Sequence, residues 1–169
     1  MKKIRIVLIV LILSGCKSMM ENQTVSKANI NSTLDDWHKA AAEANYYDYF
    51  SLMTDDAVFI GTDATENWNK TAFQAYAKPH FDKGKAWHFT ALERHIYFDE
   101  TGKTAWFDEL LNTQMKLCRG SGVLIKIGTE WKIKQYVLSM TIPNENSNEV
   151  ITVKASLEDA MIQTLKLKQ

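Results

Sequence analysis

Four side chains have the types needed for acid–base chemistry: His38, Asp63, Asp108 and Arg119. A histidine titrates near neutral pH, so it can give or take a proton during a reaction. His38 directly follows Trp37 in a stretch with helical periodicity. The sequence leaves two interpretations open, an acid–base group facing a cavity or a packed or surface histidine.

Two carboxylates, Asp63 and Glu66, lie beside Gly61 in the irregular stretch 61–68. Such a pair suits catalysis at the rim of a sheet. An aspartate also readily accepts hydrogen bonds from backbone N–H groups two residues on, so loop capping is the second interpretation. We expect Trp68, at the end of this stretch, to pack over the entrance of a cavity.

The stretch 105–109 (AWFDE) directs one of two carboxylates into the protein. Successive strand residues alternate between faces, so Trp106 shares a face with Asp108, and Phe107 shares one with Glu109. The inward carboxylate must be protonated or paired. We expect Arg119 as its partner, either in a functional site or in a structural ion pair, because arginine binds carboxylates bidentately.

The elements that position these residues follow from periodicity and turn residues. We expect a helix over residues 32 to about 54, a short strand over 57–60 and a second helix over 70–81, which Pro79 should bend or shorten. Strands are expected over 87–98, 103–115, 122–127 and 130–141, with a loose segment over 143–153 and a short helix over 157–167. The turns between the four strands are short, which favours an antiparallel sheet. The helices can bury their apolar faces only against this sheet, and a bent sheet around the long helix would form a cone with a cavity.

Aromatic residues are numerous, at 11% of the chain, and we expect most of them in the core or around the cavity. The residues expected to contact a ligand are Trp37, Tyr49, Phe59, Glu66, Trp68 and Trp106.

The composition argues against several classes of protein. The chain has 169 residues with 20 basic and 20 acidic side chains, so phosphate neutralisation, and hence nucleic-acid binding, is not expected. Glycine-rich nucleotide-binding motifs and zinc-ligand spacings do not occur in the sequence, and we expect neither cofactor nor metal. The length fits one domain.

The N-terminus resembles that of bacterial lipoproteins. Basic residues at positions 2, 3 and 5 precede eight apolar residues (6–13), too few for a membrane span of about 20. Leu-Ser-Gly-Cys (13–16) is similar to a lipobox, which implies a signal peptide over 1–15, lipid on Cys16 and anchoring to the bilayer. Lys17, directly after the cysteine, favours anchoring in the outer membrane, facing the periplasm. We expect residues 16–31 to form a tether between the bilayer and the domain. Cys118 then has no partner, so it is either a buried small hydrophobe or a partly exposed thiol.

The order of elements resembles the SnoaL-like branch of the nuclear-transport-factor-2-like (ketosteroid-isomerase-like) superfamily. The stretches that carry the resemblance are WHKAAAEANYYDYF (37–50), FIGTDATENW (59–68), AWFDE (105–109), RGSGVL (119–124) and WKIKQYVLSMTIPNE (131–145). The resemblance implies an α+β fold, in which a cone-shaped, curved antiparallel sheet wraps around a long N-terminal helix and a second helix. It assigns the domain to residues 32–145, with a tail over 146–169.

The resemblance also bears on chemistry, because the superfamily contains isomerases, dehydratases, epoxide hydrolases, cyclases and binding modules. The isomerase carboxylate has no match at Ile60-Gly61. The Asp/His pair of the dehydratases could come from Asp63 and His38, and the Asp-Arg-Asp group of the epoxide hydrolases from Asp108, Arg119 and Asp63. We therefore expect a membrane-anchored module that binds a small apolar or amphipathic molecule, or alternatively a cofactor-independent enzyme. A homodimer through the sheet is a third possibility.

Overall fold

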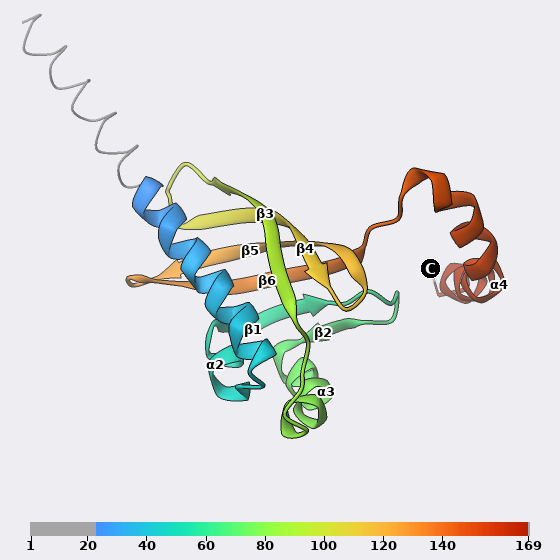
Figure 1. The fold of residues 1–169 in the computed structure, drawn as a ribbon, viewed down its shortest axis with the longest axis horizontal. Coiled ribbons are helices and arrows are strands. Elements are labelled where there is room, and N and C mark those ends of the chain that lie inside the picture. The colour runs from blue at the N-terminus through green and yellow to red at the C-terminus, as the bar shows by residue number, and fades with distance from the viewer. Residues whose placement is uncertain (1–22, 169) are drawn as a thin grey trace, which may run out of the picture.

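A computed structural model describes residues 23–168, which form an α+β fold around one six-stranded sheet (Figure 1). The leader, Cys16 and Lys17 lie outside the described residues. The strands are β1 (Met53–Ile60), β2 (Asn67–Asn69), β3 (Phe89–Phe98), β4 (Thr104–Thr113), β5 (Lys116–Ile127) and β6 (Glu130–Met140). The helices are a long N-terminal helix over 23–42, α2 (Tyr46–Ser51), α3 (Lys70–Asp82), the short 3₁₀ helix η1 (Asn144–Asn146) and α4 (Ser147–Lys166).

The N-terminal helix crosses one face of the sheet and buries a single stripe (Figure 1). Ile30, Leu34, Trp37 and Ala41 follow each other at steps of three or four residues, and each is at most 1% exposed. Residues 23–31, which we expected in the tether, are therefore part of this helix. The helix also ends earlier than expected, because Ala44 adopts a left-handed φ of 54° and the chain turns into α2.

The sheet has the strand order β2-β1-β6-β5-β4-β3. Strands β3 to β6 form the antiparallel meander that the short turns predicted. β1 joins the sheet parallel to β6, and β2 pairs antiparallel with β1. The chain passes through β2, α3 and β3–β5 before β6 returns beside β1, and local turn signals do not predict this pairing.

Register shifts interrupt three of the strand pairings, one of them between Met53 and Val58 on β1. The register also shifts between Ala91 and Glu93 on β3, and again between Val123 and Leu124 where β5 meets β6. An extra residue in one strand kinks it and increases the local twist. The concave face and the N-terminal helix enclose a core dominated by aromatic rings, so side chains fill much of the expected cone.

Two further elements have other bounds than predicted. α3 continues for three residues past Pro79, and β5 begins six residues earlier than predicted. Cys118 is fully buried, in agreement with the first of its two interpretations. No helix within residues 23–168 is both long and apolar enough to cross a membrane.

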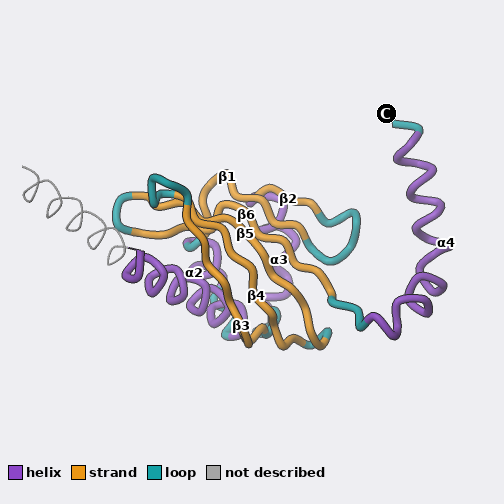
Figure 2. Tube along the Cα trace, turned by 90° about the horizontal axis from the view of Figure 1, so that it is seen from above, coloured by secondary structure: helices purple, strands orange, loops and turns teal. Residues whose placement is uncertain are grey.

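The C-terminal helix α4 stands away from the sheet in both views (Figures 1 and 2). It begins at Ser147, ten residues before the helix predicted over 157–167, and none of its residues is buried. Several large apolar side chains are exposed on it, namely Ile151, Val153, Leu157, Ile162 and Leu165.

Candidate functional site

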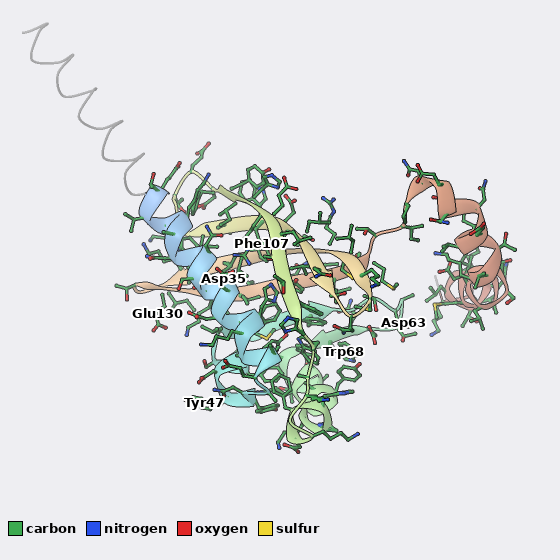
Figure 3. All side chains as sticks on the ribbon, viewed as in Figure 1. Asp35, Tyr47, Asp63, Trp68, Phe107 and Glu130 are labelled. Carbon is green, nitrogen blue, oxygen red and sulfur yellow. The ribbon has the colours of Figure 1, made fainter. Side chains whose placement is uncertain are left out.

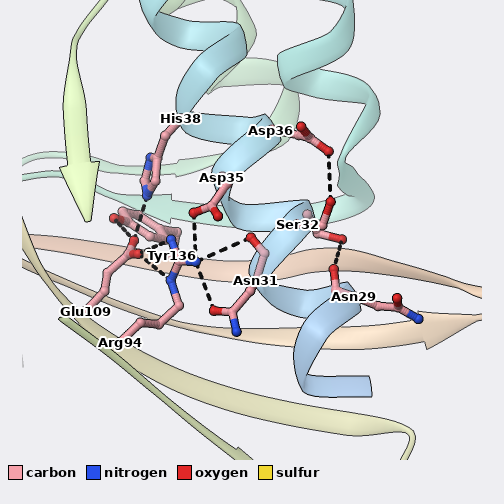
Figure 4. A network of polar contacts seen from close by, with 10 residues as sticks. Asn29, Asn31, Ser32, Asp35, Asp36, His38, Arg94, Glu109 and Tyr136 are labelled. Carbon is pink, nitrogen blue, oxygen red and sulfur yellow. Dashed lines mark hydrogen bonds and ion pairs between the residues drawn. The ribbon is translucent and has the colours of Figure 1, made fainter. Parts of the chain in front are cut away.

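A fully buried carboxylate, Glu109 on β4, is surrounded by three polar side chains (Figure 4). His38 Nε2 lies 2.8 Å from Glu109 Oε1, and the Tyr136 hydroxyl donates to the same oxygen at 2.9 Å. Arg94 Nε donates to the other oxygen, Oε2, at 2.9 Å, and its Nη2 lies 2.8 Å from the same oxygen as an ion-pair contact. These four residues are called the Glu109 cluster below.

The sheet register brings the Glu109 cluster together. Arg94 and Glu109 are direct cross-strand partners, and Gly120 pairs with Glu109 on its other side. A Cβ atom at residue 120 would lie 2.1 Å from the Tyr136 hydroxyl oxygen, so glycine is what lets Tyr136 reach the carboxylate. His38 approaches from the N-terminal helix, 71 residues earlier in the chain.

Arg94 connects this buried cluster to the protein surface. Its Nη1 donates to Asn31 Oδ1 at 3.1 Å and lies 2.9 Å from Asp35 Oδ1, both on the N-terminal helix. The Arg94 side chain is only 7% exposed, whereas that of Asp35 is 65% exposed. The guanidinium is therefore held between one buried and one exposed carboxylate, which accounts for its position inside the fold.

The electrostatics of the cluster favour an ionised Glu109. Burial alone would raise the pKa of this carboxyl, but the hydrogen bond and charge of His38, together with Arg94, outweigh burial and lower the pKa below its ordinary value. The pKa of Tyr136 is raised well above its ordinary value, first by burial and then by the negative charge of Glu109. Tyr136 is thus a neutral donor to an ionised acceptor.

The Glu109 cluster has acid–base groups but is closed. An ionised carboxylate only accepts hydrogen bonds, so His38 Nε2 must carry the proton in its bond to Glu109. The His38 ring packs edge-on against Phe89, with ring centroids 5.8 Å apart, and His38 is 5% exposed. A substrate would have to displace such rings to reach the imidazole.

A separate pocket of about 160 Å³ lies at the open end of the cone. It is called the ring pocket below, because aromatic rings make up much of its wall. Its lining residues are Phe59, Gly61, Thr62, Glu66, Trp68, Phe73, Tyr76, Trp87, Phe89, Gln114, Met115 and Leu138. They come from β1, the β1–β2 loop, β2, α3, β3, the β4–β5 turn and β6, with Trp87 just before β3.

One layer of side chains separates the ring pocket from the Glu109 cluster. Phe59 lines the pocket and stacks on Tyr136, with centroids 5.7 Å apart. Phe89 lines the pocket and contacts His38. No member of the Glu109 cluster lines the pocket, so a molecule bound there would meet rings rather than the buried acid–base pair.

The structure does not bring together the four residues predicted to carry chemistry. Of these, only His38 lies inside the fold. Asp63 is exposed at the outer end of the β1–β2 loop, away from the N-terminal helix (Figure 3), and its carboxylate accepts from the Thr65 backbone N–H at 2.9 Å, a capping contact. Asp108 lies on the outer face of the sheet, 3.2 Å from His95 Nδ1 and 3.7 Å from Arg119 Nη1.

The expectation that Arg119 pairs with the inward carboxylate is wrong. Arg119 lies opposite Leu110 in the register, and residues 108 and 110 share the face opposite to Glu109. Its partner is therefore the outward carboxylate, Asp108, while Arg94 occupies the inward position.

Three of the six expected ligand contacts line the ring pocket: Phe59, Glu66 and Trp68. Trp37 and Tyr49 stack on each other in the core with ring centroids 4.7 Å apart, and neither lines the pocket. Trp106 is 46% exposed and stacks on Tyr97 on the outer face of the sheet. The rings of this pair are available to a second molecule, and the homodimer through the sheet stays a prediction.

Sequence reasoning missed Arg94 and Tyr136. Simple alternation from the buried Phe89 would point Glu93 inward, but the bulge after Ala91 reverses the faces and directs Arg94 and Ile96 inward. A bulge of this kind has no strong signal in a single sequence. The weak signal that was present is an arginine in a strand of mixed composition, followed by a strand that carries two carboxylates.

Comparison with known proteins places the chain in a family. The family profile described as a SnoaL-like domain matches residues 30–143, and the chain therefore belongs to the SnoaL-like domain family. None of the curated proteins matches the sequence.

Solved structures of the nuclear-transport-factor-2-like type share the fold. A candidate scytalone dehydratase from Novosphingobium aromaticivorans has a TM-score of 0.63 at 11% identity, covering 73% of this chain and 89% of its own. A candidate dehydratase of the NTF2-like family from Streptomyces avermitilis has a TM-score of 0.62 at 11% identity, covering 72% and 99%. An NTF2-like protein of unknown function from Pseudomonas putida has a TM-score of 0.61 at 14% identity, covering 73% and 92%. At these identities the likeness establishes the fold alone.

Proposed function

We propose that this protein binds a small, mostly apolar molecule in the ring pocket, on a chain anchored to the cell envelope through Cys16. The observation that carries the proposal is the pocket itself, an aromatic hollow with a few polar groups at the end of the cone. Mostly apolar pockets with a few polar groups are typical of small-molecule sites.

The position of the acid–base groups favours binding over reaction. Asp63, Asp108 and Arg119 lie at the surface, apart from His38. The pair of His38 and Glu109 is engaged internally and is shielded by Phe59 and Phe89. A molecule in the pocket is therefore separated by aromatic rings from the acid–base pair of His38 and Glu109.

A cofactor-independent enzyme is the second candidate, and one observation favours it. The 2.8 Å contact between His38 and Glu109 has the geometry of an oriented acid–base pair, and it lies one ring layer behind the pocket. Two structural neighbours are described as candidate dehydratases. A displacement of Phe89 would expose the imidazole to a bound substrate.

Retention of a ligand during native purification tests the proposal. The full chain is purified without denaturation, and bound small molecules are released and identified by mass spectrometry. Trp68→Ala removes a pocket wall, and Trp106→Ala removes a tryptophan from the outer face as the matched control. We expect the wild type and Trp106→Ala to retain the same molecule and Trp68→Ala to lose it. Equal retention by the two variants, or no retained molecule, would contradict the proposal.

The retained molecule also distinguishes a binding protein from an enzyme. Incubation with the wild-type protein should return it unchanged if the protein is a binder. Conversion by the wild type, and not by a Glu109→Gln variant that still binds the molecule, would instead support the enzyme.

A further inference from the structure

The size of the ring pocket suits one ring. Its volume is about 160 Å³. A cavity of about 150 Å³ with apolar walls holds a single benzene molecule. A single ring with a short substituent therefore fits the space that is present.

The walls of the pocket favour a flat ligand. Phe73 is close to parallel with three neighbouring rings: Phe59 at an interplanar angle of 13°, Trp68 at 13° and Trp87 at 23°. Trp68 continues the stack onto Tyr76 at 23°. Rings with one shared orientation accept another ring in offset stacking, a geometry that contributes beyond burial alone.

The wall of the ring pocket carries a negative charge and no positive charge. Glu66 is the only ionisable acid or base among the lining residues apart from Tyr76, and no lysine, arginine or histidine lines the pocket. A Cβ atom on residue 61 would lie 2.1 Å from Glu66 Oε2, so Gly61 gives the carboxylate room to lie against the backbone. Oε2 accepts from the Asp63 backbone N–H at 3.2 Å, and among residues 23–168 no hydrogen bond reaches Oε1.

The negative charge of Glu66 acts on the pocket. Tyr76 also lines the pocket, and its pKa is raised first by burial and then by the charge of Glu66. The aromatic faces of Trp68 and Tyr76 present negative electrostatic potential as well, which attracts cations. The carboxylate and the ring faces therefore favour a positive charge at the pocket and disfavour a negative one.

We propose that the ring pocket selects a protonated arylalkylamine with a single ring, in which the ring stacks against the pocket aromatics and the ammonium donates to Glu66 Oε1. This inference rests on the proposed function, because it names the chemical class that the same pocket would bind. The free carboxylate oxygen supplies the ion pair, and Trp68 and Tyr76 add cation–π attraction.

Three single-ring probes of similar size test the selectivity by isothermal titration calorimetry on the full chain. Benzylamine is protonated at neutral pH, benzyl alcohol is neutral and benzoate is negative. We expect benzylamine to bind at least about tenfold more tightly than benzyl alcohol, and benzoate to bind most weakly. In Glu66→Gln the preference should fall to within about twofold, because the shape is kept and the charge is removed.

Glu100→Gln is the matched control. Glu100 lies in the turn that follows the C-terminal end of β3, whereas the pocket residue Phe89 is at the N-terminal end of this strand. The variant removes the same charge and should keep the preference for benzylamine. Benzyl alcohol or benzoate binding as tightly as benzylamine would overturn the inference and leave the proposed function standing. A preference that survives Glu66→Gln would also overturn it. Failure of all three probes to bind, with ligand retention unaffected by Trp68→Ala, would overturn the inference and the proposed function together.

Discussion

At the scale of single residues, Glu109 holds together side chains from three other elements. Its two oxygens accept from His38, Tyr136 and Arg94, and its side chain is fully buried. Removing one partner of a buried ion pair leaves the other charge without compensation, and the resulting loss of folding stability is large. Half-exposed pairs such as that of Asp108 and Arg119 contribute far less.

Glu109→Gln should lower the free energy of unfolding by about 3–5 kcal/mol, because the buried Arg94 guanidinium loses its buried countercharge and keeps only the exposed Asp35. Asp108→Asn, on the opposite face of the same strand, should cost less than about 1 kcal/mol. Urea unfolding followed by circular dichroism measures both. Equal losses in the two variants would show that Glu109 is not the buried centre of charge described here.

The same carboxyl predicts how stability depends on pH. The pKa of Glu109 is lower in the folded protein than its unfolded value of about 4.3. Its contribution is therefore fully present above about pH 4.3 and is lost as the pH falls through the lower, folded value. The unfolding free energy of the wild type should fall more steeply with acidification than that of Glu109→Gln. Parallel curves for the two proteins would contradict this prediction.

At the scale of elements, most of the secondary structure follows from the sequence, and the differences have local causes. The four antiparallel strands and α3 were predicted from alternation and turn residues. The break after the N-terminal helix was missed, because nothing in a run of alanines marks Ala44 as the residue that turns the chain. The bulge on β3 was missed for the same reason, and with it the inward direction of Arg94.

Ala44→Gly should raise the free energy of unfolding by about 0.5–1 kcal/mol, because glycine adopts the left-handed φ of 54° without the steric cost of a Cβ atom. Ala42→Gly, two residues earlier at a helical position, should lower it instead. Thermal and urea unfolding of both variants test the pair. A loss of stability in Ala44→Gly would mean that the turn adopts another conformation in solution.

The helix α4 should be dispensable for the stability of the domain. It buries none of its residues, and the family match ends at residue 143, before the helix begins. A chain that ends at Asn146 should keep its unfolding free energy within about 0.5 kcal/mol of the full chain, as expected when only surface residues are removed. A loss well above that value would show that the apolar side chains of α4 pack on the domain in solution.

At the scale of the whole molecule, the proposed location depends on one cysteine. The resemblance of residues 13–16 to a lipobox implies lipid on Cys16, and the described domain begins only a few residues later. Three or more acyl chains hold a protein stably on a bilayer, whereas one chain binds only marginally. An anchored ring pocket would meet molecules close to the membrane surface.

Cys16→Ser should abolish incorporation of radiolabelled palmitate and release the protein from the outer-membrane fraction. Cys118→Ala, which changes the other cysteine of the chain, should leave both unchanged, because Cys118 is buried in the domain. Fractionation and labelling in a bacterial host measure both effects. Labelled Cys16→Ser protein would refute the anchor.

The sequence by itself determined the class of fold, the antiparallel meander, and that either Asp108 or Glu109 points inward. These depend on short-range periodicity and turn chemistry, which a single chain displays directly. Only the tertiary structure decided that β1 pairs parallel with β6, that Arg94 rather than Arg119 meets the buried carboxylate, and that a layer of rings closes the Glu109 cluster off from the pocket. Each of these depends on strand register and on packing between segments far apart in the chain, where a shift of one residue turns every side chain to the other face.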